Sequence, residues 1–281
     1  MRSVYPAKVL LLGEHTVLRG GRGLAVPYPA CHLQWATGTD PDDRLQDFAA
    51  YLRRAAFPID HARFQEALAA GWYLRGNIPT GYGLGSSGAV CAAVYDRFGT
   101  EGETPELREL RHLLAGMEGF FHGSSSGTDP LVAYRQEPIL LEEAGGVAAL
   151  ALPANWADGW FLLDTGITRQ AGPLIERFLA AHDADPDAIR TGWQEPADEA
   201  IAALVGGWHD ELYAAVTRVS DFQMERFPDF IPPDYREVWD GGEAYRLKIC
   251  GAGGGGMLLG LARDTTRVRE LFGSDVQWLA V

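Results

Sequence analysis

Short apolar runs alternate with turn residues along the chain and predict a mixture of strands and helices. Residues 9–12 form an apolar run that stops at Gly13, which is typical of a buried strand. Between Pro105 and Phe121 the leucines recur at the spacing of one helical face. The other predicted strands cover residues 24–27, 72–78, 138–152, 160–164, 245–250 and 257–261. The other predicted helices cover residues 45–71 with a break at Pro58, the stretch from the 81–88 glycine loop to about Phe98, and residues 173–181 and 197–219.

Strands and helices follow one another in mixed order, which indicates the α+β class. A chain of 281 residues is long enough for two modest domains. We place the boundary between Leu152 and Trp160, and therefore expect an N-terminal domain of residues 1–155 and a C-terminal domain of residues 156–281.

Charge and hydropathy exclude several classes of partner. The net charge is −14 and no basic run occurs, which argues against a nucleic-acid partner, since phosphates require a positive footprint. No apolar run approaches the roughly 18 residues that span a bilayer. The N-terminus also lacks the apolar segment of a signal peptide, so we expect a cytoplasmic protein without a membrane partner.

The chain has 24 basic residues, and only Lys8 and Lys248 among them are lysines. A general preference for arginine is one explanation. However, each lysine opens one of the glycine-bearing motifs of the chain. Lysine is a compact point charge, which fits beside a phosphate or a reacting hydroxyl where a planar guanidinium fits differently.

The first glycine-bearing motif covers residues 78–90 and runs directly into a predicted helix. Glycines let the backbone approach a ligand, and a helix N-terminus adds positive potential, so this segment predicts an anion site suited to a phosphate chain. A serine cap would explain Ser86 or Ser87 but not the glycines before them. Gly83, Gly85 and Gly88 also satisfy G-x-G-x-x-G, so a dinucleotide site of the Rossmann type stays as an alternative.

Two further motifs follow. Small residues between His122 and Asp129 predict a tight loop that presents one carboxylate, although Asp129 before Pro130 is also typical of an ordinary turn. After Lys248, four consecutive glycines lie between two apolar strands. Their loss of backbone entropy indicates a close approach of the backbone, either to a ligand or to another backbone segment.

The three motifs, in this order, resemble the signature motifs of the GHMP kinases. Residues 79–87 match the phosphate loop of that superfamily, P-x-x-x-G-L-G-S-S, throughout. The opening at residues 8–17, the H-G-x-x-S-G-x-D pattern at residues 122–129 and the K-x-x-G-A-G-G-G-G pattern at residues 248–256 are most similar to the mevalonate kinases. Gly88 stands where many members have alanine, a departure that we expect to be harmless.

The resemblance implies a role for each matched residue. Asp129 would be the catalytic base and Lys8 the lysine beside it, while Ser87 and Glu118 would hold Mg²⁺. Five residues would lie near the acceptor: Glu14, His15, His122, Gly253 and Gly254. The residues that would bind the phosphates of ATP are Pro79, Gly81, Gly83, Leu84, Gly85, Ser86, Ser87 and Gly88.

The resemblance also implies a fold and an activity. The expected fold joins an N-terminal domain like ribosomal protein S5 domain 2 to a ferredoxin-like C-terminal domain. The expected activity is ATP- and Mg²⁺-dependent phosphorylation of a small-molecule alcohol, with the 5-hydroxyl of mevalonate favoured. Phosphomevalonate, homoserine or a sugar as acceptor stays open, as do a non-catalytic nucleotide-binding role on the same fold and a homodimeric state.

Overall fold

The computed structural model describes residues 2–39, 42–100, 105–168 and 171–280. Contacts divide the chain into two compact units, each built from separate stretches of sequence. The first unit takes residues 1–8, 26–80 and 84–137, and the second takes residues 9–25, 81–83 and 138–281. These units interleave along the chain, and the predicted domain boundary at residue 155 stays a prediction.

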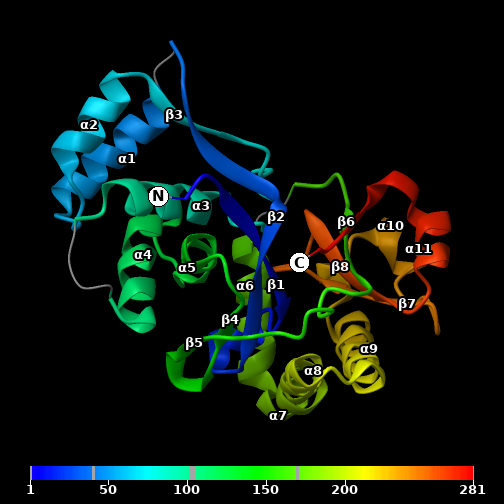
Figure 1. The fold of residues 1–281 in the computed structure, drawn as a ribbon. Coiled ribbons are helices and arrows are strands. Elements are labelled where there is room, and N and C mark those ends of the chain that lie inside the picture. Colours follow the sequence, from blue (N-terminus) through cyan, green and yellow to red (C-terminus); the bar gives the residue numbers. More distant parts are fainter. Residues whose placement is uncertain (1, 40–41, 101–104, 169–170, 281) are drawn as a thin grey trace. The chain divides into compact units, whose positions relative to one another are not determined.

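The first unit contains helices and the strand β3 (Trp72–Gly76). Its helices are α1 (Asp43–Arg54), α2 (His61–Ala69), α3 (Ser86–Phe98), α4 (Leu107–His122) and α5 (Thr128–Arg135). The helices α1 and α2 lie side by side, and the carboxylates of Asp42 and Asp60 accept backbone N–H groups at their starts (Figure 1). The strand β3 pairs antiparallel with the later part of β2 (Gly23–Thr37), from Leu33 opposite Gly76 to Thr37 opposite Trp72.

The strands β1 (Tyr5–Leu12) and β2 run through both units, and β1 is the neighbour of β2 in the larger sheet. In the second unit the first residues of β2 pair antiparallel with β4 (Ile139–Leu141), which pairs with β5 (Val147–Ala149). Every residue of β1 except Leu10 is buried, as the apolar run at residues 9–12 predicts.

The second unit also holds a separate antiparallel sheet. Its strands are β6 (Trp160–Asp164), β7 (Tyr245–Ile249), β8 (Met257–Ala262) and β9 (Val276–Trp278), in the spatial order β7-β8-β6-β9. Counted along the chain this order is 4-1-3-2 from β9 to β7, with helices between β6 and β7 and between β8 and β9, as in ferredoxin-like domains. The structure therefore confirms the ferredoxin-like arrangement and the α+β class.

Helices of the second unit cover this sheet and supply its core. They are α6 (Ala171–Ala184), α7 (Pro186–Ile189), α8 (Glu195–Gly206), α9 (His209–Arg226), α10 (Pro233–Arg236) and α11 (Thr265–Phe272), with a π-helical turn, η3 (Arg190–Gln194), between α7 and α8. The core is largely aromatic: Phe161, Phe178, Trp193 and Phe227 are completely or almost completely buried in one cluster.

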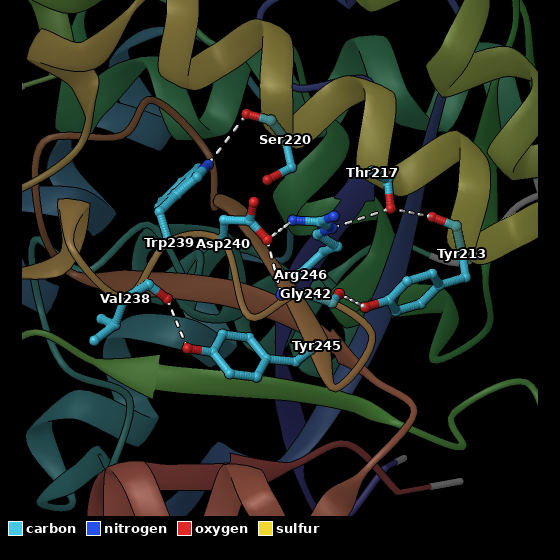
Figure 2. Close-up of polar contacts among 9 residues, drawn as sticks. All are labelled: Tyr213, Thr217, Ser220, Val238, Trp239, Asp240, Gly242, Tyr245 and Arg246. Carbon is cyan, nitrogen blue, oxygen red and sulfur yellow. Dashed lines mark hydrogen bonds and ion pairs between the residues drawn. The ribbon is translucent and has the colours of Figure 1, made fainter.

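Polar contacts tie α9 to the chain that leads into β7 (Figure 2). The indole of Trp239 donates to the carbonyl of Ser220 at 3.1 Å, and the hydroxyl of Tyr213 donates to the carbonyl of Gly242 at 2.8 Å. Arg246 pairs with Asp240 and donates from Nε to the Thr217 hydroxyl at 3.3 Å. These bonds fix the start of β7, the strand that ends one residue after Lys248.

Two predicted elements are wrong. The single helix predicted over residues 197–219 is two helices, because Gly207 adopts a left-handed conformation (φ 70°) and ends α8. The loop predicted up to Asp129 ends earlier, since α5 begins at Thr128 and accommodates Pro130 in its first turn, where a missing N–H costs no hydrogen bond. Among the described residues, no helix combines the length and the apolar character needed to cross a membrane.

Candidate active site

The glycine loop before α3 leaves the start of this helix open. Gly81, Gly83 and Gly85 all have positive φ angles, between 74° and 83°, a conformation that costs glycine little. Gly85 is the N-cap of α3, and no side chain caps the helix. The first N–H groups of a helix have no partner within it, so the turn that contains Ser86 and Ser87 presents donors suited to an anion.

Lys8 and Asp129 form an ion pair in the first unit. Nζ of Lys8 lies 3.1 Å from Oδ1 of Asp129, and the backbone N–H of Lys8 donates to the carbonyl of Leu84 at 3.0 Å. A Cβ atom at Gly85 would lie 3.1 Å from Oδ2 of Asp129 and 3.2 Å from Cγ of Lys8. The absence of a side chain at Gly85 therefore lets the pair lie directly against the start of α3. The Asp129 side chain keeps 28% of its surface exposed, so a substrate hydroxyl can reach it.

Gly88 allows α5 to approach α3 closely. A Cβ atom at this position would lie 2.6 Å from the backbone nitrogen of Pro130 and 2.7 Å from the carbonyl carbon of Asp129. Both distances are too short for a real side chain. Gly88 is therefore more than a harmless departure from the family pattern, because the position of Asp129 depends on it.

Glu118 is buried among hydroxyl groups. Only 4% of the residue is exposed, and its two carboxylate oxygens accept from the hydroxyls of Ser87 (2.7 Å) and Ser125 (2.5 Å). Burial, followed by the negative charge of Asp129, raises the pKa of Glu118 to about 7, against the opposing effects of the two serines and Lys8. A carboxylate in this environment is costly to ionise unless a cation lies beside it.

His122 lies next to Ser87. Its Nε2 atom is 3.0 Å from the Ser87 hydroxyl, and the residue is exposed. When Glu118 is ionised, Ser87 donates its only proton to Glu118, so His122 then donates from Nε2 to Ser87. The structure thus brings His122 together with the predicted metal ligands, and the place near the acceptor that the resemblance implies for it stays a prediction.

In the second unit, Glu14 forms an ion pair with Lys248. The Nζ–Oε1 distance is 2.6 Å, and the two side chains are 0% and 1% exposed. The Gln223 amide donates to the same Glu14 oxygen at 2.9 Å and accepts from the backbone N–H of Ile249 at 2.9 Å, while Lys248 also donates to the carbonyl of Ile249. This network gives Lys248 a place inside the unit, joining the turn after β1 to the end of β7.

His15 is buried beside this network. Its backbone has a φ of 62°, which is unusual for a residue with a side chain and indicates a constrained turn. The ring packs against Phe178 and Phe230, each at a centroid distance of 5.0 Å, and Nε2 lies 3.1 Å from the carbonyl of Ala252. His15 therefore links the turn after β1 to the glycine cluster at residues 251–256.

The glycine cluster packs against other backbone segments of the second unit. The N–H of Gly254 donates to the carbonyl of Phe230, and that of Gly256 donates to the carbonyl of Ile167, both at 2.6 Å. A Cβ atom at Gly253 would lie 2.8 Å from the Phe230 oxygen. Of the two explanations that the sequence leaves open, the close approach of backbone to backbone is confirmed. Acceptor contacts of Gly253 and Gly254 stay a prediction.

The matching family is described as the GHMP kinases N terminal domain, and its sequence model matches residues 46–137. The mevalonate kinase of Aeropyrum pernix is 25% identical over 303 residues, covering 94% of this chain and 89% of that relative. This chain contains a GHMP kinase N-terminal domain and has the GHMP kinase fold.

Solved structures share the GHMP kinase fold. L. major mevalonate kinase in complex with R-mevalonate is 17% identical, with a TM-score of 0.66 over 100% of this chain and 96% of that one. Streptococcus pneumoniae phosphomevalonate kinase in complex with phosphomevalonate and AMPPNP is 16% identical, with a TM-score of 0.68 over 99% of this chain and 98% of that one. At these identities the likeness concerns the fold.

The residues of the candidate site fit a magnesium ion. Magnesium prefers oxygen ligands and usually takes only one or two protein groups in addition to substrate phosphates. The Ser87 hydroxyl and the buried Glu118 carboxylate, in contact at 2.7 Å, are such a pair. Throughout the described ranges, no cluster of three or more His, Cys, Asp or Glu side chains could hold a metal alone.

Sequence reasoning missed three residues: Ser125 and Gln223, which bond to Glu118 and Glu14, and Arg111, whose Nε donates to the carbonyl of Ser126 at 2.7 Å. Ser125 lies inside the H-G-x-x-S-G-x-D pattern at one of its variable positions, so the pattern did not mark it. Arg111 precedes Glu118 by seven residues, which is two helical turns and therefore the same face of α4. That periodicity is a signal that could have found it. Nothing in the local pattern around Gln223 marks it.

Proposed function

We propose that this GHMP kinase transfers the terminal phosphate of ATP to the 5-hydroxyl of mevalonate. The observation that carries the proposal is the ion pair of Lys8 and Asp129, which lies against the uncapped start of α3 in the same unit as Ser87 and Glu118. Phosphoryl transfer needs positioning and charge stabilisation more than covalent chemistry, and this set of groups supplies both.

In the proposed reaction, the backbone N–H groups of the first turn of α3 bind the phosphates of ATP. Asp129 accepts the proton of the acceptor hydroxyl as the hydroxyl oxygen attacks the terminal phosphorus of ATP. The bond between that phosphorus and the β–γ bridging oxygen breaks, and ADP leaves with the bridging oxygen. Lys8, 3.1 Å from that carboxylate, orients it and stabilises negative charge on the attacking oxygen. Ser87 and Glu118 would hold Mg²⁺, which would neutralise negative charge on the phosphate oxygens of ATP.

The choice of mevalonate rests on a different argument. The opening at residues 8–17 and the two later motifs are most similar to the mevalonate kinases, and a curated relative that covers most of the chain carries that name. A solved structure of the same fold is a phosphomevalonate kinase, so an acceptor with an added phosphate is the alternative that most needs a test.

A coupled assay of ADP release tests both parts of the proposal. The purified protein is given ATP and Mg²⁺ with mevalonate, phosphomevalonate, homoserine or galactose, and Asp129→Asn serves as the inactive control. We expect the highest kcat/KM with mevalonate and a product phosphorylated at the 5-hydroxyl. A higher kcat/KM with another alcohol would overturn the substrate alone. ATP binding without transfer to any of the alcohols would overturn the catalytic role.

A further inference from the structure

One face of α4 lies along the segment that leads to Asp129. Arg111, Ala115, Glu118 and His122 follow one another at intervals of four, three and four residues, which places them on a single helical face. Glu118 accepts from Ser125 in that segment, and a Cβ atom at Gly127 would lie 2.9 Å from Cβ of Ala115. The segment at residues 123–128 therefore returns against the helix that it has just left.

At the N-terminal end of this face, Arg111 binds the segment directly. Its Nε donates to the carbonyl of Ser126 at 2.7 Å, a short distance typical of a charge-assisted hydrogen bond. Gly127, with a φ of 73°, is pressed onto the same residue, because a Cβ atom there would lie 2.3 Å from the carbonyl oxygen of Arg111 and 3.0 Å from its Cγ. Desolvation by burial lowers the pKa of Arg111, as expected of a guanidinium held against protein.

The carbonyl that Arg111 binds, that of Ser126, lies three residues before Asp129 in the sequence. Gly127 is the N-cap of α5, and Asp129 is the second residue of that helix. The Ser126 hydroxyl donates to the Thr128 hydroxyl at 3.1 Å and accepts from the backbone N–H of Thr128 at 3.3 Å. A fixed Ser126 therefore fixes the first turn of α5, and with it the direction of the Asp129 side chain.

We propose that Arg111 is a positioning residue, which holds the peptide of Ser126 and Gly127 so that Asp129 stays beside Lys8. The inference rests on the proposed phosphoryl transfer, in which Asp129 is the base. It assigns a role to a residue outside the three motifs, and it explains why Gly127 must be a glycine. Arg111 itself touches neither the acceptor nor ATP in this role.

The test compares Arg111→Ala and Arg111→Lys with Arg108→Ala, which removes an exposed arginine one turn earlier on the same helix. Displacing a catalytic group by about 1 Å costs on the order of 10²-fold, so we expect Arg111→Ala to lower kcat by roughly 10- to 100-fold. KM for ATP should change little, because the start of α3 is untouched. Lysine reaches the same carbonyl with poorer geometry, so the kcat of Arg111→Lys should lie between those of the wild type and Arg111→Ala. Added methylguanidinium should restore part of the activity of Arg111→Ala.

Hydrogen exchange of the peptides that cover residues 123–130 gives a readout that does not depend on activity. We expect faster exchange there in Arg111→Ala than in the wild type, and no change in Arg108→Ala. Unchanged exchange would overturn the inference, and so would faster exchange with a kcat within about threefold of the wild type. If Arg111→Ala fails to fold, the same criteria apply to Arg111→Lys. A wild type without phosphotransferase activity would instead refute the proposed function, while exchange would still decide whether Arg111 holds the segment.

Discussion

Lys8 and Lys248, the two lysines of the chain, each pair with a carboxylate, and the two pairs differ in their surroundings. Lys8 and Asp129 are 3.1 Å apart with side chains 9% and 28% exposed, whereas Lys248 and Glu14 are 2.6 Å apart and 0% and 1% exposed. A partly exposed carboxylate can meet a substrate. A fully buried pair has no such access, and removal of one partner leaves an uncompensated buried charge. The same pairing of residues thus suits the proposed chemistry in one unit and a structural role in the other.

Replacing the carboxylate of the Lys8–Asp129 pair should have the largest effect on activity. Asp129→Asn keeps the shape and removes the basicity, so kcat should fall by roughly 10²–10⁴-fold. The melting temperature should change by no more than a few degrees, since the side chain is partly exposed. Asp47→Asn, an exposed aspartate on α1 of the same unit, is the control. A kcat within about threefold of the wild type would reduce Asp129 to a helix-start residue.

Breaking the buried Lys248–Glu14 pair should lower stability instead of activity. Lys248→Met leaves Glu14 buried without its cation and should lower the free energy of unfolding by roughly 3–5 kcal/mol. Adding Glu14→Gln removes the second charge and keeps an acceptor for Gln223, so the double variant should recover much of the loss in denaturant unfolding. If Lys248→Met unfolds like the wild type, the pair has no structural role. A raised acceptor KM in the stable double variant would sharpen the comparison, because it would mean that Glu14 also contacts the acceptor.

Lys8→Arg tests whether the Lys8–Asp129 pair needs a compact positive charge. The guanidinium keeps the positive charge, but the Lys8 side chain is only 9% exposed, so a larger planar group at its end must displace its neighbours. We expect kcat to fall by roughly 10- to 100-fold with little change in melting temperature. Near-normal turnover would show that charge alone suffices at this position.

Glu118 allows the smallest and most specific test. It is nearly as buried as Glu14, and its two carboxylate oxygens accept from the hydroxyl groups of Ser87 and Ser125. Because its pKa rises from 4.5 to about 7 on folding, its contribution to stability is complete below about pH 4.5 and is lost as the pH rises through about 7. Glutamine does not titrate. Without Mg²⁺ and nucleotide, the melting temperature of Glu118→Gln relative to the wild type should therefore rise between about pH 5.5 and about pH 8.

The exposed Glu109, also on α4, supplies the matched control for this measurement. Glu109→Gln should shift the melting temperature by the same small amount at every pH in that range. If the difference between Glu118→Gln and the wild type is equally flat with pH, burial does not raise the pKa of Glu118 in the folded protein.

Local patterns in the sequence predicted the elements well where one face of an element is buried. The strand at Trp160–Asp164 and the helix that ends at Phe98 are examples, because apolar periodicity reports burial directly. The break between α8 and α9 was missed although Gly206 and Gly207 mark it. The helix α5 was missed because glycine and proline at its start are typical of a turn as well as of a helix N-terminus.

The contacts within the candidate site were harder to predict from the residues alone. The resemblance to the GHMP kinases grouped Lys8 with Asp129 and Ser87 with Glu118, and the structure brings both pairs together. No motif indicated that Lys248 would meet Glu14, since the two lie near opposite ends of the chain and only the folded unit joins them. Side-chain partners of this kind depend on tertiary packing, which a local pattern does not encode.

Glycine begins α3 and α5, the helices that carry Ser87 and Asp129, and no side chain caps either of them. Elsewhere in the same protein, an aspartate caps α1, α2, α7 and α11. Such a cap contributes about 0.5–2 kcal/mol of stability, so α3 and α5 lack stabilisation that these four helices have. Selection for heat resistance should therefore find stabilising substitutions at many positions that leave turnover unchanged. Substitutions that raise stability by capping α3 or α5 should instead lower turnover.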